Sequence, residues 1–147
     1  MVILIITFIG IFIFFFVKKK NKTTINSIKH DKKFVEKILS GLSKFENTQI
    51  YLDKGFNIKN LAELLNTNTS YLSSIINNYK NKTFKYYLSE LRINFAVDKM
   101  NNDQKFLKFK IESMGKEVGY SNASSFTRAF KRIKNITPSE YIKLNFP

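Results

Sequence analysis

Apolar residues recur at every third or fourth position over most of this chain, which is the spacing of one face of an α-helix. The first such series consists of Phe34, Ile38, Leu42 and Phe45. Asp31 can cap this helix, and Gly41 weakens it slightly. A short apolar connector, residues 50–56, follows the helix and closes in a turn at Asp53-Lys54-Gly55.

Two short helices joined by a polar turn come next, over about residues 57–79. Asn57 can cap the first of them and Asn68 the second. The turn is Asn66-Thr67-Asn68. The side chains expected to face inward are Leu61, Ala62, Leu64 and Leu65 on the first helix, and Leu72, Ile75 and Ile76 on the second. Two short helices that cross closely at a small residue, here Ala62, are the pattern of a helix-turn-helix unit.

The same pattern repeats over about residues 110–134. The first helix of the repeat carries Ile111, Met114, Gly115 and Val118, the turn is Gly119-Tyr120-Ser121, and the second helix carries Phe126, Phe130 and Ile133. Gly115 takes the place of Ala62, and the turn is one residue longer. An internal repeat is more specific than either half. The sequence therefore predicts two helix-turn-helix units.

A single helix over about residues 83–101 is expected to connect the two units. Thr83 can cap this helix. We interpret its apolar stripe as core packing; the stripe consists of Phe84, Tyr87, Leu88, Leu91, Phe95 and Met100. After the second unit, Thr137-Pro138-Ser139-Glu140 predicts a capping box that starts a closing helix with Tyr141, Ile142 and Leu144. Because the 147 residues include only 5 glycines and 2 prolines, the expected fold class is all-α.

The composition gives the chain a strong positive charge and lacks the residues on which most catalytic sites depend. Lys and Arg number 25 against 11 Asp and Glu, a formal net charge of +14. Such an excess costs self-repulsion unless a polyanion is bound, so nucleic acid and anionic lipid are candidate partners. Cysteine is absent and His30 is the only histidine, which excludes cysteine and imidazole metal sites and catalytic triads. The sequence also contains no Gly-rich phosphate loop. We therefore expect no enzyme activity, cofactor or metal.

Residues 1–17 carry no charge and are nearly all Ile, Phe, Val and Leu. As a helix this run would span roughly 25 Å, the short edge of what crosses a bilayer. The lysines that follow it, Lys18, Lys19, Lys20 and Lys22, mark the cytoplasmic side. A cleaved signal peptide would need basic residues before the run, and a soluble core helix would need every face buried. We therefore predict a single-pass transmembrane helix in the cell inner membrane, a basic juxtamembrane linker at residues 18–30 and a cytoplasmic body at residues 31–147.

Five groups of residues carry a family resemblance. They are Leu61-Ala62-Glu63-Leu64-Leu65, Tyr71-Leu72-Ser73, Tyr87-Leu88-Ser89-Glu90-Leu91-Arg92, Glu117-Val118-Gly119-Tyr120 with Ser125-Phe126-Thr127-Arg128-Ala129-Phe130-Lys131, and Thr137-Pro138-Ser139-Glu140-Tyr141. In this order and spacing they resemble the AraC/XylS family of bacterial transcription regulators over about residues 34–144. The resemblance implies a DNA-binding domain at residues 31–147, in which the second helix of each unit enters the major groove. Gly115 departs from the usual alanine, at a cost of about 1 kcal/mol in a helix interior.

A narrower resemblance rests on four short motifs, Phe45-Glu46, Asn66-Thr67-Asn68, Ile75-Ile76-Asn77 and Leu91-Arg92-Ile93-Asn94. These motifs are similar to the membrane-bound Bacteroidetes branch of the family. In that branch a tetratricopeptide-repeat sensor precedes a transmembrane helix and the DNA-binding domain. The resemblance implies a sensor that is either a missing domain or a separate partner.

The resemblance also places the candidate DNA contacts. The residues expected to read base edges are Ser70, Ser73, Ser74 and Asn77 on the first reading helix, and Asn122, Ser124, Thr127 and Arg128 on the second. Asparagine can pair with adenine and arginine with guanine, but Arg128 can equally contact a phosphate. The cations expected on phosphates are Lys80, Lys82, Lys85, Lys131, Arg132 and Lys134.

Together these features predict a membrane-anchored, sequence-specific transcription regulator that reads two successive major-groove segments of double-stranded DNA. The alternative is a basic membrane-associated interaction protein, or a truncated relic that has lost specific DNA binding. The intact repeat favours the regulator, because drift would erode a repeat early.

Overall fold

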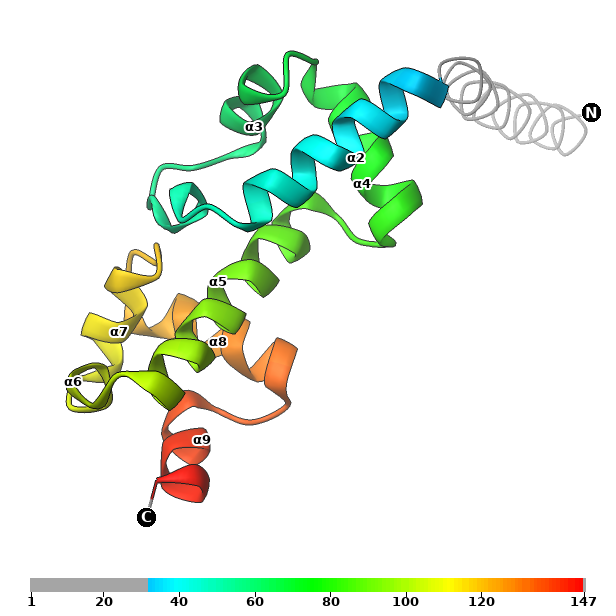
Figure 1. Cartoon of the computed structure of the whole chain (residues 1–147). Coiled ribbons are helices and arrows are strands. Elements are labelled where there is room, and N and C mark those ends of the chain that lie inside the picture. The colour runs from blue at the N-terminus through cyan, green and yellow to red at the C-terminus, as the bar shows by residue number, and fades with distance from the viewer. Residues whose placement is uncertain (1–31, 147) are drawn as a thin grey trace, which may run out of the picture. The chain divides into compact units, whose positions relative to one another are not determined.

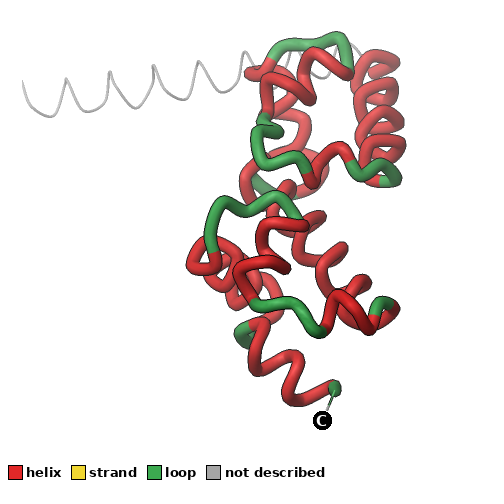
Figure 2. Tube along the Cα trace, turned by 90° about the vertical axis from the view of Figure 1, so that its left-hand side faces the viewer, coloured by secondary structure: helices red, strands yellow, loops and turns green. Residues whose placement is uncertain are grey.

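The computed structural model describes residues 32–146, so the expected transmembrane helix, the linker and the Asp31 cap lie outside the described residues. Both helix-turn-helix units lie in one compact unit, Ile38–Pro147. Every regular element from residue 32 to residue 146 is a helix, as Figures 1 and 2 show, which agrees with the all-α expectation for these residues. Over the same range, no helix combines the length and the apolarity needed to cross a membrane.

The first helix-turn-helix unit consists of α3 (Ile58–Leu64) and α4 (Thr69–Lys80). The long helix α2 (Lys32–Glu46) precedes the unit, followed by a single 3-10 turn, η1 (Ile50–Leu52), where the sequence predicted only a connector. The expected core positions of α3 and α4 are buried, except that Leu64 is exposed and Leu65 is half-buried. Leu64 is 54% exposed, because α3 ends there and Leu65 instead lies against α2 beside Gly41.

The connecting helix α5 (Phe84–Asn102) packs against a different partner at each end, and Figure 1 shows it between the two helix-turn-helix units. Tyr87 and Leu88 are buried near its start, where it meets α4. Ile93, Ala96 and Met100 are buried farther along, in the core of the second helix-turn-helix unit. The predicted stripe missed Ile93 and Ala96 because a helix with two partners buries two faces.

The second helix-turn-helix unit consists of α7 (Ile111–Glu117) and α8 (Ala123–Lys134), and α9 (Pro138–Asn145) closes the chain. Its core contains nine buried residues, namely Ile93, Ala96, Met100, Phe106, Met114, Val118, Phe126, Ala129 and Phe130. Phe106 comes from α6 (Gln104–Leu107), a short helix that the apolar pattern did not predict. Asp103 caps α6, since its Oδ1 accepts hydrogen bonds from the backbone N–H groups of Lys105 and Phe106.

The two helix-turn-helix units repeat each other element by element. The first helix has 7 residues and the second 12 residues in both units. In each unit an asparagine side chain caps the second helix, and an asparagine with left-handed backbone ends it. The turns match too, because Asn66 in one and Gly119 in the other have positive φ angles of 53° and 84°. The caps expected at Asn57, Asn68, Thr83 and Thr137 are all confirmed. The fold thus contains the same helix-turn-helix unit twice, each with its own reading helix.

Candidate nucleic-acid interface

The outer face of α4 carries small polar side chains. Ser70 and Asn77 are exposed, whereas Ser73 and Ser74 are half-buried. This face lies opposite the buried residues of α4, which are Leu72, Ile75 and Ile76. Tyr79, which the sequence analysis did not select, is 49% exposed at the end of the same helix. The first reading helix therefore offers hydroxyl and amide groups, and no charge until Lys80.

The second reading helix, α8, has a more strongly charged surface. Ser124 and Arg128 are exposed and Thr127 is half-buried. Asn122 is already engaged, because its Oδ1 accepts a hydrogen bond from the Ser125 backbone N–H at 2.8 Å. While it caps the helix, Asn122 can donate from Nδ2 and has only the second lone pair of Oδ1 left for a base. The other polar side chains that α8 presents among the predicted contacts are Ser124, Thr127 and Arg128.

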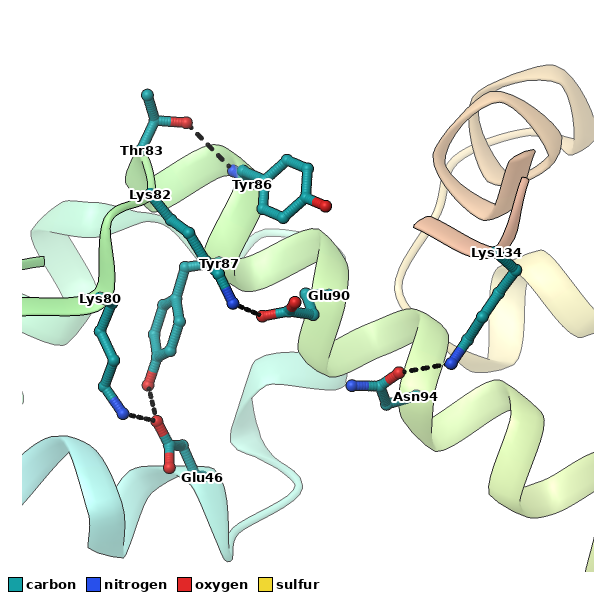
Figure 3. A network of polar contacts seen from close by, with 9 residues as sticks. All are labelled: Glu46, Lys80, Lys82, Thr83, Tyr86, Tyr87, Glu90, Asn94 and Lys134. Carbon is teal, nitrogen blue, oxygen red and sulfur yellow. Dashed lines mark hydrogen bonds and ion pairs between the residues drawn. The ribbon is translucent and has the colours of Figure 1, made fainter. Parts of the chain in front are cut away.

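Three of the six predicted phosphate contacts have partners inside the protein (Figure 3). Lys80 Nζ lies 2.8 Å from Glu46 Oε1, which also accepts a hydrogen bond from the Tyr87 hydroxyl at 2.9 Å. The pKa of Tyr87 is raised, mainly by burial and secondly by the hydrogen bond to Glu46. Because partly exposed ion pairs contribute only about 0–1 kcal/mol, Lys80 can exchange its carboxylate for a phosphate at little cost.

The other two internal contacts attach cations to α5. Lys82 pairs with Glu90, and Lys134 Nζ donates to Asn94 Oδ1 at 2.9 Å, as Figure 3 also shows. Both cations lie near an end of a reading helix and are half-buried. Lys134 thereby joins the end of α8 to the middle of the connecting helix, and it helps to fix the position of the second reading helix.

The remaining predicted phosphate contacts, Lys85, Lys131 and Arg132, are exposed and belong to no ion pair in the part of the chain that the structure describes. The Arg132 guanidinium lies 5.3 Å from the centre of the Tyr86 ring, a cation–π contact that holds it over α5. Arg132 and Lys85 line a groove between α5 and α8 that Arg128 also lines. The structure thus brings Lys85, Arg128 and Arg132 together, whereas Lys131 does not line the groove.

Arg92, which the sequence offered only as part of family motifs, is a buried cation that also lines this groove. It is only 8% exposed, its Nε donates to the Tyr51 carbonyl oxygen at 2.7 Å, and a terminal nitrogen donates to the Asp53 carbonyl oxygen at 2.6 Å. Burial lowers its pKa, while Tyr120 and Asp53 oppose that shift. The sequence signal was the series Lys85, Ser89 and Arg92, which places polar groups along one side of α5 at helical spacing.

Gly119 lies beside Arg92 at the contact between the two halves of the repeat. A Cβ atom on Gly119 would lie 2.5 Å from the Leu52 carbonyl oxygen and 2.9 Å from Arg92 Cζ. Leu52 belongs to η1, before the first helix-turn-helix unit, and Gly119 to the turn of the second. The turn of the second unit therefore packs directly on η1. The Arg92 side chain, which comes from α5, contacts both of these segments.

A family profile described as a helix-turn-helix domain matches residues 61–144, more than half of the chain and both units. The chain belongs to the AraC family of helix-turn-helix transcription regulators. This is a family of DNA-binding domains and not of enzymes. The AraC-type region is 29% identical over 89 residues to the raffinose operon transcriptional regulatory protein RafR of Pediococcus pentosaceus, covering 60% of this chain and 31% of that protein.

Another relative is the uncharacterized HTH-type transcriptional regulator YtdP of Bacillus subtilis (strain 168). It is 29% identical over 81 residues, which cover 55% of this chain and 10% of YtdP. The chain therefore spans a third or less of the curated relatives that it matches.

Solved structures share the AraC-type fold. The C-terminal domain of AraT, a response regulator from Geobacillus stearothermophilus, has a TM-score of 0.63 at 20% identity, over 76% of this chain and 87% of that one. A transcriptional regulator with an AraC-type DNA-binding domain from Chromobacterium violaceum has a TM-score of 0.59 at 19% identity, over 76% and 96%. These matches show a shared fold over about three quarters of this chain.

Proposed function

We propose that this chain binds double-stranded DNA as the DNA-binding part of a transcription regulator, with α4 and α8 each entering one segment of the major groove. The observation that carries the proposal is the pair of matched reading helices. Both have 12 residues, both begin at an asparagine cap, and both pack on α5. The major groove of B-DNA is about 12 Å wide and admits one α-helix. The net charge of +14 supplies the attraction to the phosphates.

Two reading helices on one support meet one face of the duplex about one turn apart, roughly 34 Å or 10 base pairs. Their exposed residues differ, because α4 offers three serines and Asn77, whereas α8 offers Ser124, Thr127 and the positive charge of Arg128. A single protomer would therefore read an asymmetric site. We therefore also propose that the chain reads two successive segments sequence-specifically.

The test of DNA binding is its salt dependence, measured with the full chain in a neutral detergent. Six to ten phosphate contacts would lose roughly 10³ to 10⁵ in affinity between 50 and 200 mM salt. Affinity that does not change over this range would contradict binding through phosphates. If the chain binds anionic vesicles but no duplex DNA, the alternative of a basic membrane-associated protein replaces the proposal.

We also infer that residues 1–17 anchor the chain in the cell inner membrane, with residues 18–147 in the cytoplasm. Support comes from the uncharged run and from the lysines that come directly after it. Protease added outside intact cells should then leave residues 57–144 uncut, whereas their digestion would contradict this topology. A sensor, in the same protein or in a partner, and the narrower membrane-bound branch stay predictions.

A further inference from the structure

A groove of about 610 Å³ opens between α5 and α8, and its charged lining is entirely positive. Lys85 and Arg92 line it from α5, and Arg128 and Arg132 from α8. No aspartate or glutamate lines the groove. Its volume lies within the range of ligand sites, roughly 300–1,000 Å³, but those sites are mostly apolar. A groove lined by four cations instead suits an anionic ligand.

The four cations of this groove differ from Lys80 and Lys82 in having no carboxylate partner. None of the four forms an ion pair within residues 32–146. Like charges around one groove repel one another, and an anion between them removes this repulsion. Lys80 and Lys82, by contrast, each have a carboxylate partner inside the protein.

Two of the guanidinium groups are held in place before any ligand binds. Arg132 lies over the Tyr86 ring, and Arg92 lies over the Tyr120 ring at 5.6 Å while its hydrogen bonds fix it to two backbone carbonyls. The Tyr120 hydroxyl is buried beside the groove without a hydrogen bond of ordinary geometry among the described residues. Groups that are already positioned lose less entropy on binding, which favours a specific ligand.

From this arrangement we infer that the α5–α8 groove binds one phosphate group, and that Arg128 contacts this phosphate instead of a base. Guanidinium groups match phosphate oxygens with paired hydrogen bonds, and the hydroxyls of Ser89 and Ser125 on the groove wall can donate as well. The inference rests on the proposed function for the source of the phosphate. Under the proposed function, this phosphate would belong to the DNA strand that flanks the major groove entered by α8. The shared chemistry is a phosphate group, which a free phosphate compound can also supply.

The first experiment compares Arg128→Gln with Lys143→Gln in the full chain in neutral detergent. Lys143 is exposed on α9 and does not line the groove, so its variant removes the same charge elsewhere. Binding to a library of duplex sequences is measured at several salt concentrations. We expect Arg128→Gln to weaken all sequences alike and to reduce the slope of log affinity against log salt by about 0.9, the value for one phosphate contact. Lys143→Gln should leave the slope unchanged. A changed preference at one base pair with an unchanged slope would overturn the assignment of Arg128.

The second experiment identifies the source of the phosphate without DNA. Inorganic phosphate is titrated into the ¹⁵N-labelled chain, with chloride at equal ionic strength as control, and the side-chain Nε–Hε signals of Arg128 and Arg132 are followed. Saturable shifts with phosphate alone support the site, even if the chain binds no DNA and the proposed function fails. If the shifts are saturable but Arg128→Gln leaves the salt slope of DNA binding unchanged, the groove binds a free phosphate compound, and DNA is not the source of the phosphate. If phosphate causes no shift and Arg128→Gln does not change the salt slope, the inference is wrong.

Discussion

Gly115 lies at a point in the second helix-turn-helix unit where a side-chain carbon has no room. A Cβ atom there would lie 2.9 Å from Phe126 Cβ and 3.2 Å from Phe126 Cγ, and Phe126 is completely buried. In the first unit the corresponding residues are Ala62 and Leu72, a larger and a smaller side chain respectively. Gly115 therefore replaces the usual alanine because the smaller residue leaves room for the larger Phe126.

We predict that Gly115→Ala destabilises the protein although alanine favours helices by about 1 kcal/mol. Phe126 Cβ cannot rotate away, and overpacking a core costs about 1–3 kcal/mol. Gly41→Ala is the matched control, because the atom it meets, Leu65 Cδ2, is the end of a side chain that can change rotamer. Thermal unfolding of both variants, followed by circular dichroism, should give a lower midpoint for Gly115→Ala and little change for Gly41→Ala. Equal midpoints would contradict the packing argument.

At the scale of single helices, the asparagine caps position both reading helices. The Asn68 Oδ1 atom accepts a hydrogen bond from the Tyr71 backbone N–H at 2.8 Å, as Asn122 does for Ser125. Each cap satisfies a backbone donor that the helix itself leaves free. The caps thereby determine where α4 and α8 begin, and so which side chains lie in their first turns.

We predict that Asn68→Ala lowers the free energy of unfolding by about 1 kcal/mol, the usual cost of losing a cap. Asn78→Ala changes the same residue type in the interior of α4, where the side chain is exposed and no hydrogen bond is lost. That variant should be neutral or slightly stabilising, because alanine is the better helix former. Denaturant unfolding of the two variants measures the difference. An Asn68→Ala variant as stable as Asn78→Ala would show that the cap contributes nothing.

The sequence predicted the helices that show a recurring apolar face, and it failed where no such recurrence exists. Helix α6 is a single turn that buries Phe106 alone, so no periodicity could show it. The prediction for α5 was incomplete because two partners bury two of its faces. For the candidate site, all eight base-reading candidates are exposed or half-buried, but their DNA contacts stay predictions. The α5–α8 groove was missed because it depends on how two helices pack.

At the scale of the whole compact unit at residues 38–147, Arg92 and Gly119 connect the two halves of the repeat. Arg92 donates to two backbone carbonyls around η1, and the Gly119 turn packs on the Leu52 carbonyl oxygen. We predict that Arg92→Lys lowers the free energy of unfolding by about 1–3 kcal/mol, because a lysine cannot satisfy both carbonyls with the same geometry.

Arg132→Lys is the control for this prediction, since Arg132 is exposed and makes no hydrogen bond within the described residues. Its variant should unfold at nearly the wild-type denaturant concentration. A loss of stability in Arg132→Lys as large as that in Arg92→Lys would indicate a general effect of replacing arginine, and would contradict the role of Arg92 as a link between the two halves.

The central claim is that one protomer reads two successive segments of the major groove through α4 and α8. The most direct measurement is selection of bound duplexes from a random-sequence library by the full chain in neutral detergent at moderate salt. The account predicts two enriched sequence elements that differ from each other and are separated by about 10 base pairs centre to centre. Enrichment of a single element, or of a palindrome within the footprint of one protomer, would contradict it.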